Sequence, residues 1–234
     1  MSASHPQQWA ILTDDHRPDP AAVAALASLP TTQLADCGGP VAVVGPGIAR
    51  RAGGPEFCGP ALTVWTKPGD ILYVLKAPDL ARPGDVLVVD SGGRADAAVL
   101  GDIVSGVLRR AGVVGTLVDG AIRDVDGIDE VGVPTFARDV HPATGSKDGP
   151  GAINVTVQIG GVVVRPGDVV RGDASGVVVV AREHLDEVVG LARAVADRET
   201  VWLESTRGGA ALATATGLDE VIREQRRGAG VELP

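Results

Sequence analysis

Aromatic residues are scarce in this chain of 234 residues, where three Trp, two Phe and one Tyr make up 3%. Proteins that bind single-stranded nucleic acid stack bases on aromatic side chains, so this class is disfavoured. Basic residues are also outnumbered, with 21 Lys and Arg against 30 Asp and Glu and a net charge of −9. Proteins that bind duplex nucleic acid carry a basic face. We therefore expect no nucleic-acid partner.

Long apolar runs and a cysteine framework are also missing. No stretch reaches the roughly 18 consecutive apolar residues of a membrane-spanning helix, so we expect no membrane partner. Residues 1–20 lack the basic start and apolar stretch of a secretory signal. Cys37 and Cys58 have no second pair of cysteines with which to form a zinc site. These features predict a reduced, cytoplasmic protein.

The chain is instead rich in aliphatic residues. Hydrophobic residues make up 44% of it, enough for one large core built from Val, Ala, Leu and Ile. Residues 1–18 are predicted to form a flexible lead-in, residues 19–205 the main domain, and residues 206–234 a C-terminal loop, short helix and tail.

Helices are predicted at both ends of the main domain. Asp19 and Pro20 form a helix start, because an acidic N-cap precedes a proline at the first helical position. Thr31 is expected to cap a second short helix. Apolar spacing predicts a long helix over about 183–203 and a last helix near 219–227.

Strands are predicted where short Val, Ile and Leu runs alternate with Gly and Pro, over about 41–90 and 153–181. A Pro-Gly-Asp phrase occurs at residues 68–70, 83–85 and 166–168. Proline presets φ and glycine accepts positive φ, so each copy fits a type II turn.

The middle of the chain alternates between strand and helix patterns. Residues 103–111 place apolar side chains on one helical face, and residues 113–118 form a continuous apolar run typical of a buried strand. A turn at residues 119–120, a helix over 126–131 and a strand over 133–137 are predicted next. This alternation is typical of an α/β fold with parallel strands.

Two polar pairs occupy positions where α/β proteins bind ligands. Gly101 and Asp102 begin a helix, whose first amides favour a carboxylate or phosphate. Arg123 and Asp124 follow a buried strand, and ligands gather outside the carboxyl ends of such strands. An Arg beside an Asp offers a fork for a carboxylate and an oxygen ligand for a hard cation. The alternatives are an ordinary helix-terminal acid and a surface ion pair.

The chain resembles the RraA-like family, which includes class II 4-hydroxy-4-methyl-2-oxoglutarate/4-carboxy-4-hydroxy-2-oxoadipate aldolases and regulators of RNase E activity. The resemblance rests on LGD at residues 100–102 and DGAIRD at residues 119–124. It continues through VPTFAR at residues 133–138 and HP at residues 141–142, and covers roughly residues 20–205. It implies an RraA-like α/β fold with a β/β/α swivelling-type core, flanking terminal helices, and assembly into a homotrimer or hexamer.

The resemblance also implies roles for individual residues. Asp124 would be the direct protein ligand of a divalent cation, Mg²⁺ or Mn²⁺, and Asp102 would hold water bound to that ion. Arg123 would contact substrate oxygen atoms as a catalytic residue. The amides of Gly101, Asp102, Ile103 and Val104 would bind the carboxylate of a pyruvyl group.

The function implied is that of a metal-dependent lyase. It would cleave a 4-hydroxy-2-oxo dicarboxylic acid, a small 2-oxo acid substrate, into pyruvate and a second carbonyl product through a metal-bound pyruvate enolate. Decarboxylation of oxaloacetate would use the same site. The alternative is a non-catalytic protein-binding regulator similar to the RNase E inhibitors.

Some positions depart from the family pattern or stay open. The acidic turn that often precedes the late strand is here DASG, residues 173–176. Aldolase members use a glutamate from a neighbouring subunit, for which Glu199 and Glu204 are both candidates. Lys147 is either a solvated side chain or a contact for a distal substrate carboxylate. His141 is either a loop residue or a substrate contact.

Overall fold

The structure, a computed structural model, describes residues 6–13 and 17–229. It divides into two compact units, residues 1–189 and residues 190–234, and the border falls inside one long helix. The predicted border at residues 205–206 stays a prediction. No helix among the described residues is both long and apolar enough to cross a bilayer.

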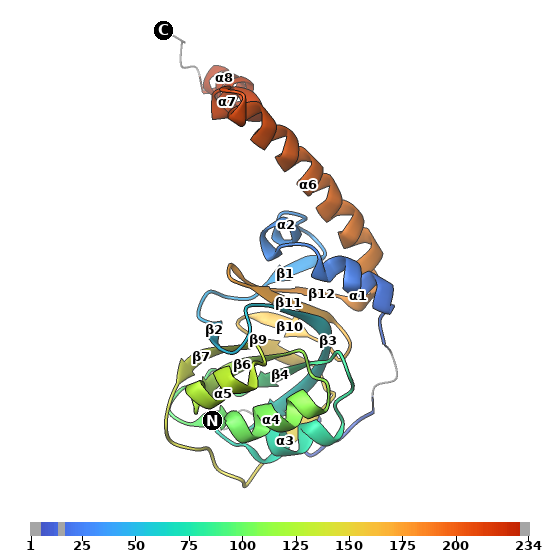
Figure 1. Cartoon of the computed structure of the whole chain (residues 1–234), viewed down its shortest axis with the longest axis vertical. Coiled ribbons are helices and arrows are strands. Elements are labelled where there is room, and N and C mark those ends of the chain that lie inside the picture. The colour runs from blue at the N-terminus through green and yellow to red at the C-terminus, as the bar shows by residue number, and fades with distance from the viewer. Residues whose placement is uncertain (1–5, 14–16, 230–234) are drawn as a thin grey trace. The chain divides into compact units, whose positions relative to one another are not determined.

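The first unit is a mixed α/β structure built around a ten-stranded sheet (Figure 1). The described strands are β1 (Val41–Val43), β2 (Ala49–Ala52), β3 (Phe57–Thr66), β4 (Val86–Asp90), β5 (Ala98–Leu100), β6 (Gly115–Ile122), β7 (Thr135–Val140), β8 (Gly151–Ile153), β9 (Val157–Ile159), β10 (Val162–Val164), β11 (Val169–Asp173) and β12 (Gly176–Val180). The described helices of this unit are α1 (Pro20–Ala27), α2 (Thr31–Ala35), α3 (Leu72–Lys76), α4 (Asp102–Arg110) and α5 (Val125–Val131), with 3-10 turns η1 (Ala77–Asp79) and η2 (Arg182–His184).

The sheet follows the order β1-β12-β11-β3-β4-β6-β7-β2, with β5 added to β6 and β8 added to β3. Strands β3, β4, β6 and β7 run parallel to one another, as the alternation of strand and helix patterns predicted. Strands β1, β12 and β11 form an antiparallel extension. Strands β9 and β10 form a separate antiparallel hairpin.

Alternating side chains of the central strands supply two cores. In β4, Leu87 and Val89 belong to the cluster that includes helix residues, whereas Val86 and Val88 belong to the cluster that includes β9 and β10. This period of two is what a strand buried on both faces requires. The layers are therefore helices α3–α5, the parallel sheet, and a second β layer, in agreement with the expected β/β/α core.

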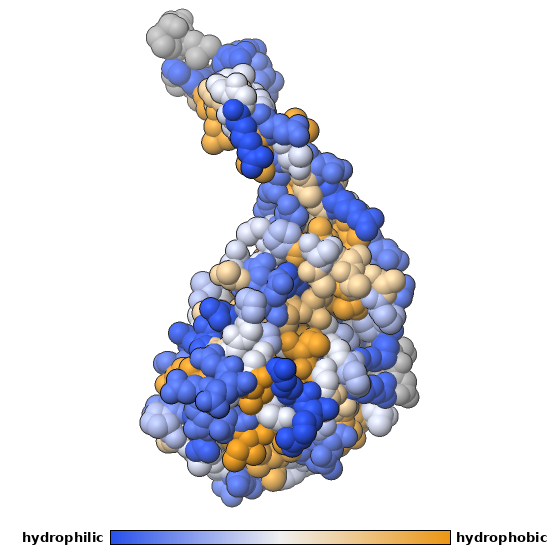
Figure 2. All heavy atoms as spheres, viewed as in Figure 1, coloured by the Kyte–Doolittle hydropathy of each residue, from blue (hydrophilic) through white to orange (hydrophobic). Residues whose placement is uncertain are grey.

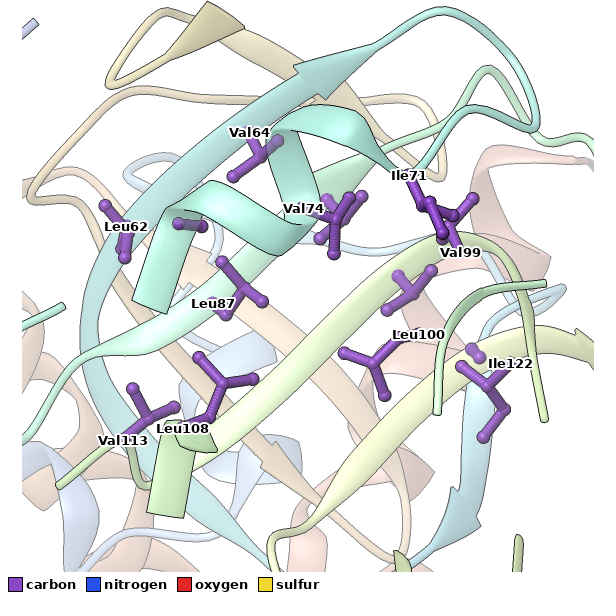
Figure 3. Close-up of a cluster of buried hydrophobic side chains, with 14 of the residues drawn as sticks. Leu62, Val64, Ile71, Val74, Leu87, Val99, Leu100, Leu108, Val113 and Ile122 are labelled. Atoms are coloured by element: carbon purple, nitrogen blue, oxygen red, sulfur yellow. The ribbon is translucent and has the colours of Figure 1, made fainter. Parts of the chain in front are cut away.

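The helix-side core joins the site elements to the sheet. Figure 3 shows Leu87 and Leu100 from the strands meeting Val74 of α3 and Leu108 of α4. All four side chains are at most 2% exposed. Burying a Leu or Val side chain contributes about 1.5–3 kcal/mol to folding. The buried side chain of Leu108 therefore holds α4 against the sheet.

The second unit contains most of helix α6 (Leu185–Arg207), followed by α7 (Leu212–Thr216) and α8 (Leu218–Gly228). The long helix and the last helix agree with the predicted ranges. Helix α7 lies where the sequence predicted a loop.

Local turn chemistry was predicted well. Glycines at the centre of the three Pro-Gly-Asp turns, Gly69, Gly84 and Gly167, have φ between +75° and +88°. In each turn the aspartate amide donates to the carbonyl three residues earlier, at 2.8–3.1 Å. The start of α1 is also as expected, because the Asp19 side chain accepts a hydrogen bond from Ala21 N.

Several expected local features are wrong. Residues 119–120 are not a turn, because β6 continues through them to Ile122 as a fully buried strand. Thr31 is the first residue of α2 rather than its cap, and its hydroxyl donates to Asp173 instead. Ile103 is not on the buried face of α4, since its side chain is 77% exposed.

The described part of the N-terminal lead-in makes defined contacts. Trp9 N donates to Gly151 O at 2.7 Å, and Ile11 forms a parallel bridge with Ile153. Arg17 forms an ion pair with the buried Asp85. The rest of the expected flexible segment, residues 1–5 and 14–16, lies outside the described residues.

Both cysteines are free thiols. Burial raises the pKa of Cys58 to about 12, although the nearby Arg171 acts in the opposite direction. Burial and the Asp36 carboxylate raise the pKa of Cys37 as well. Because the thiolate is the nucleophile, neither side chain is activated for chemistry.

The short hairpin between β11 and β12 fastens helix α2 to the sheet. Asp173 accepts hydrogen bonds from Thr31 N at 2.8 Å and from the Thr31 hydroxyl at 2.7 Å. Burial alone would raise the pKa of Asp173, but these hydrogen bonds and one from Ser175 N hold it below its ordinary value.

We expect Asp173→Ala to lower the free energy of unfolding by about 1–3 kcal/mol in urea denaturation, because two donors on Thr31 lose their acceptor. Since the folded-state pKa of Asp173 is depressed, its contribution is present above the unfolded pKa of about 3.9 and disappears as the pH falls through the lower folded-state value. Asp79→Ala is the control, because its ion pair with Lys76 is on the surface. Equal losses in both variants would contradict this role.

Candidate functional site at the ends of strands β5 and β6

A cavity of about 290 Å³ lies where α4 and α5 begin. It includes the six residues to which the family resemblance assigned roles in metal, carboxylate or substrate binding. Its lining comprises Ile71, Leu75, Ala98, Val99, Leu100, Gly101, Asp102, Ile103, Val104, Arg123, Asp124, Thr144 and Lys147. Figure 2 shows strongly hydrophilic and apolar residues side by side over the region where Figure 1 places α3 and α4.

Parallel pairing of two strands brings the two sequence motifs together. Leu100 at the end of β5 is in register with Ile122 at the end of β6. The residues that follow are therefore neighbours, and Arg123 N donates to Leu100 O at 2.9 Å. This explains how Gly101 and Asp124, more than twenty residues apart in the chain, reach one site.

Gly101 is required for space rather than for its backbone conformation. Its φ of −143° is open to any residue. A Cβ atom at this position, however, would lie 2.6 Å from Asp124 Oδ2 and 3.3 Å from Arg123 Cγ. The missing side chain therefore allows the Asp124 carboxylate to approach the start of α4 closely.

Asp124 has a left-handed backbone, with φ 55° and ψ 45°, at the start of α5. This conformation costs an L-residue of this kind of order 1 kcal/mol, and such residues concentrate at functional sites. Its Oδ2 lies 3.1 Å from Arg123 Nε, and the two side chains are 39% and 38% exposed. The pair is thus accessible from the cavity rather than sealed in the core.

The first turn of α4 carries an acidic side chain, and no side chain caps the helix. Gly101 precedes the helix in an extended conformation and supplies no capping side chain. Asp102 Oδ1 accepts a hydrogen bond from Ile103 N at 2.6 Å. A Cβ on Gly127 of α5 would lie 2.8 Å from Asp102 Oδ2, so that glycine also leaves room for a site carboxylate.

The apolar lining includes residues that sequence reasoning did not select. Ile71 and Leu75 come from α3 and the turn before it, a helix too short to show a periodic pattern. Ile103 and Val104, which the family resemblance had selected, line the cavity too, and Ile103 is largely exposed. The cavity is therefore lined by apolar side chains as well as by the charged Arg123–Asp124 pair.

Lys147 also lines the cavity and is exposed to solvent, so both of its interpretations stay open at this point. Within residues 6–13 and 17–229, Lys147 forms no ion pair. His141 is not among the lining residues, and its Nδ1 accepts a hydrogen bond from Ala143 N at 3.2 Å.

Asp119, the first residue of the DGAIRD motif, lies outside the cavity. Its side chain is 7% exposed and forms an ion pair with Arg138 of β7, whose Nη2 lies 3.2 Å from Asp119 Oδ2. The same oxygen accepts a hydrogen bond from Gly160 N at 2.7 Å. This part of the motif joins β6, β7 and the β9–β10 hairpin and is structural.

Oxygen donors in the cavity suit a hard cation. Asp102 and Asp124 are its two acidic residues. In the described part of the chain, no three His, Cys, Asp or Glu side chains gather as a metal cluster. Glu199 and Glu204, the candidates for a residue supplied by a neighbouring subunit, lie on α6 in the second unit. That role remains a prediction.

A family model described as Aldolase/RraA matches residues 23–179, well over half of the chain. The chain belongs to the RraA-like family. Its fold and the positions of its two motifs agree with this membership.

One relative carries the name of an enzyme. A protein of Halalkalibacterium halodurans, provisionally named a 4-hydroxy-4-methyl-2-oxoglutarate aldolase, is 43% identical over 138 residues. That match covers 59% of this chain and 66% of the relative, just under two thirds.

Solved structures extend the likeness over more of the chain. An uncharacterized protein from Pseudomonas syringae pv. tomato is 31% identical, with a TM-score of 0.74, over 86% of this chain and 98% of that one. RraAS2 of Streptomyces coelicolor, described as an unusual member of the RNase ES inhibitor RraA family, is 32% identical. Its TM-score is 0.71 over 83% of this chain and 99% of that one.

We expect Gly101→Ala to reduce the free energy of unfolding by up to about 1 kcal/mol, because alanine is a poorer N-cap than glycine and its methyl group displaces the Asp124 carboxylate. Gly106→Ala in the same helix is the matched control, since no atom lies within 4 Å of its Cβ position. That change should stabilise the protein by about 0.5–1 kcal/mol through helix propensity. Urea denaturation of both variants checks the signs, and a stabilised Gly101→Ala variant would contradict the close approach.

Proposed function

We propose that this protein is a divalent-metal-dependent lyase of the RraA-like family. Its substrate would be a 4-hydroxy-2-oxo dicarboxylic acid of the 4-hydroxy-4-methyl-2-oxoglutarate type, cleaved to pyruvate and a second carbonyl product. Oxaloacetate decarboxylation would use the same site. The observation that carries the proposal is the accessible Arg123–Asp124 pair beside the α4 N-terminus in one cavity.

The donor set fits Mg²⁺ or Mn²⁺. Magnesium prefers oxygen ligands, keeps several waters, and is commonly held by one or two carboxylates. Asp124 would be the direct ligand, and Asp102 would hold a water of the ion. The space left by the missing Gly101 side chain lies directly against Asp124 Oδ2. When bound, the ion would supply a Lewis acid that stabilises negative charge on the 2-oxo group.

Different groups of the cavity would bind the substrate and stabilise the negative charge that develops on it. The α4 N-terminus, from Gly101 to Val104, would bind the pyruvyl carboxylate through its amides and helix dipole. Arg123 would face the 2-oxo oxygen, where negative charge accumulates as the C3–C4 bond breaks. The C4 hydroxyl would lose its proton to the Asp102 carboxylate through an ordered water. For oxaloacetate the same electron flow would release carbon dioxide and requires no such base.

The alternative function is a non-catalytic protein-binding regulator. It is favoured by the likeness to a Streptomyces protein described as a member of an RNase inhibitor family. A pure binding surface, however, has no need for Asp102, Arg123 and Asp124 around one cavity. We therefore place the lyase first.

Pyruvate release from oxaloacetate and from 4-hydroxy-4-methyl-2-oxoglutarate separates the two functions. We expect turnover with Mg²⁺ or Mn²⁺ and its loss in EDTA, restored by adding the ion back. Absence of turnover of both substrates with every divalent ion tested would support the regulator instead.

Substitutions of the central pair test the residue roles. We expect Asp124→Asn and Arg123→Ala to stay folded but to lose at least about 10²-fold in kcat/KM, as for removal of a principal charge stabiliser. Asp126→Asn is the control, because Asp126 is exposed on the same helix and does not line the cavity. Steady-state kinetics gives kcat/KM for each variant, and thermal unfolding shows whether each variant is folded. Wild-type turnover in Asp124→Asn would place the metal elsewhere.

A further inference from the structure

A buried carboxylate outside the cavity holds one of the cavity's loops. Asp70 is 0% exposed and accepts hydrogen bonds from four donors. Oδ1 accepts from Leu72 N at 2.9 Å, and Oδ2 accepts from the Ser146 hydroxyl at 2.7 Å. The same Oδ2 accepts from Asp148 N at 2.7 Å and from Gly149 N at 3.0 Å. Three of the four donors thus come from one loop, residues 144–149.

Comparison with the other two Pro-Gly-Asp turns shows that this arrangement is particular to Asp70. Asp85 and Asp168 fold back on their own turns and accept hydrogen bonds from Arg82 N and Arg165 N, both at 2.8 Å. Asp85 also pairs with Arg17, and Asp168 also accepts a hydrogen bond from Arg182 N at 3.2 Å. Of the three, Asp70 is the one that binds the loop at residues 144–149, 76–79 residues along the chain.

The backbone around Asp70 reinforces the connection. Ile71 N donates to Ser146 O at 2.8 Å, and Ser146 N donates to Gly69 O at 3.0 Å. A Cβ on Gly145 would lie 2.3 Å from Gly69 O, so the two segments approach more closely than a side chain would allow. The loop is held by backbone and side-chain hydrogen bonds together.

Ionisation of Asp70 is favoured by its surroundings. Burial alone would raise the pKa of its carboxyl, but the Ser146 hydroxyl and the three backbone amides outweigh burial and hold the pKa below its ordinary value. A charged acceptor forms stronger hydrogen bonds than a neutral one. The loop is accordingly tied to a carboxylate that stays charged near neutral pH.

Both segments that Asp70 joins line the cavity. Ile71 and Leu75 belong to its apolar lining, and Thr144 and Lys147 belong to the loop. Lys147 lies between Ser146 and Asp148, the two residues that carry the shortest of these hydrogen bonds. The position of its backbone is therefore set from both sides.

We infer that Asp70 is a positioning residue that holds Lys147 in the cavity to bind the distal carboxylate of the substrate. The inference rests on the proposed lyase function and adds how a dicarboxylic substrate is selected. Arg123 is already paired with Asp124, whereas Lys147 is exposed at the cavity and forms no ion pair within the described residues. Its charge is therefore available to a second substrate carboxylate.

The experiment compares two substrates that differ at the distal group, 4-hydroxy-4-methyl-2-oxoglutarate and the monocarboxylate 4-hydroxy-2-oxopentanoate. We expect Lys147→Ala and Asp70→Asn each to raise KM for the dicarboxylate about tenfold with a smaller change in kcat. For the monocarboxylate, kcat/KM should stay within about twofold of wild type. In Asp70→Asn an amide NH₂ replaces an acceptor, so loop donors lose their partner.

A double variant separates positioning from general stability. If Asp70 acts through Lys147, Asp70→Asn should have little further effect on the dicarboxylate KM in the Lys147→Ala background. Asp168→Asn is the matched control, because it changes an equally buried aspartate of the same turn type away from the cavity. It should leave both substrates unaffected. Equal losses on both substrates, or additive effects in the double variant, would overturn the inference.

Binding measurements keep this test independent of turnover. Calorimetric titration with 2-oxoglutarate and 2-oxobutyrate should show that Asp70→Asn and Lys147→Ala weaken binding of the dicarboxylate alone. If the wild type cleaves neither substrate, the lyase proposal fails while the binding result still decides the role of Asp70. If both variants bind 2-oxoglutarate as the wild type does, the positioning inference fails whatever the activity.

Discussion

The parallel pairing of β5 with β6 is the constraint on which the candidate site depends. It places Gly101 directly beside Arg123 and Asp124, and it starts α4 and α5 at the same edge of the sheet. The absence of a side chain at Gly101 then lets a carboxylate lie against a helix N-terminus. Without that contact the apolar lining of the cavity would remain, but the Asp124 carboxylate would no longer lie beside the first turn of α4.

The cavity combines three kinds of group that the proposed 2-oxo acid substrate and its metal ion would need. Asp124 and Asp102 carry carboxylate oxygens, Arg123 carries a positive charge, and the start of α4 carries backbone amides. Apolar residues from α3 and the turn before it line the same cavity. Lys147 adds a second cation on a loop whose geometry is set by a buried carboxylate.

Sequence reasoning reached the parts of this structure that depend on local chemistry. The glycine of each Pro-Gly-Asp turn, the start of α1 and the range of α4 follow from turn and helix preferences. The buried continuation of β6 through Asp119 did not, because it depends on β4 and β7 on either side. For Lys147 the sequence left two alternatives open, because its place at the cavity depends on hydrogen bonds between segments far apart in the chain. The family resemblance, rather than spacing, assigned roles to Arg123 and Asp124.

Binding of Mn²⁺ is the most direct measure of the central claim, that the Asp124 carboxylate holds a divalent cation in this cavity. Electron paramagnetic resonance of free Mn²⁺ counts the bound ions without requiring a substrate or a reaction. The account predicts one ion per chain in the wild type and loss of that site in Asp124→Asn, with Asp126→Asn unchanged. An undiminished site in Asp124→Asn would contradict it.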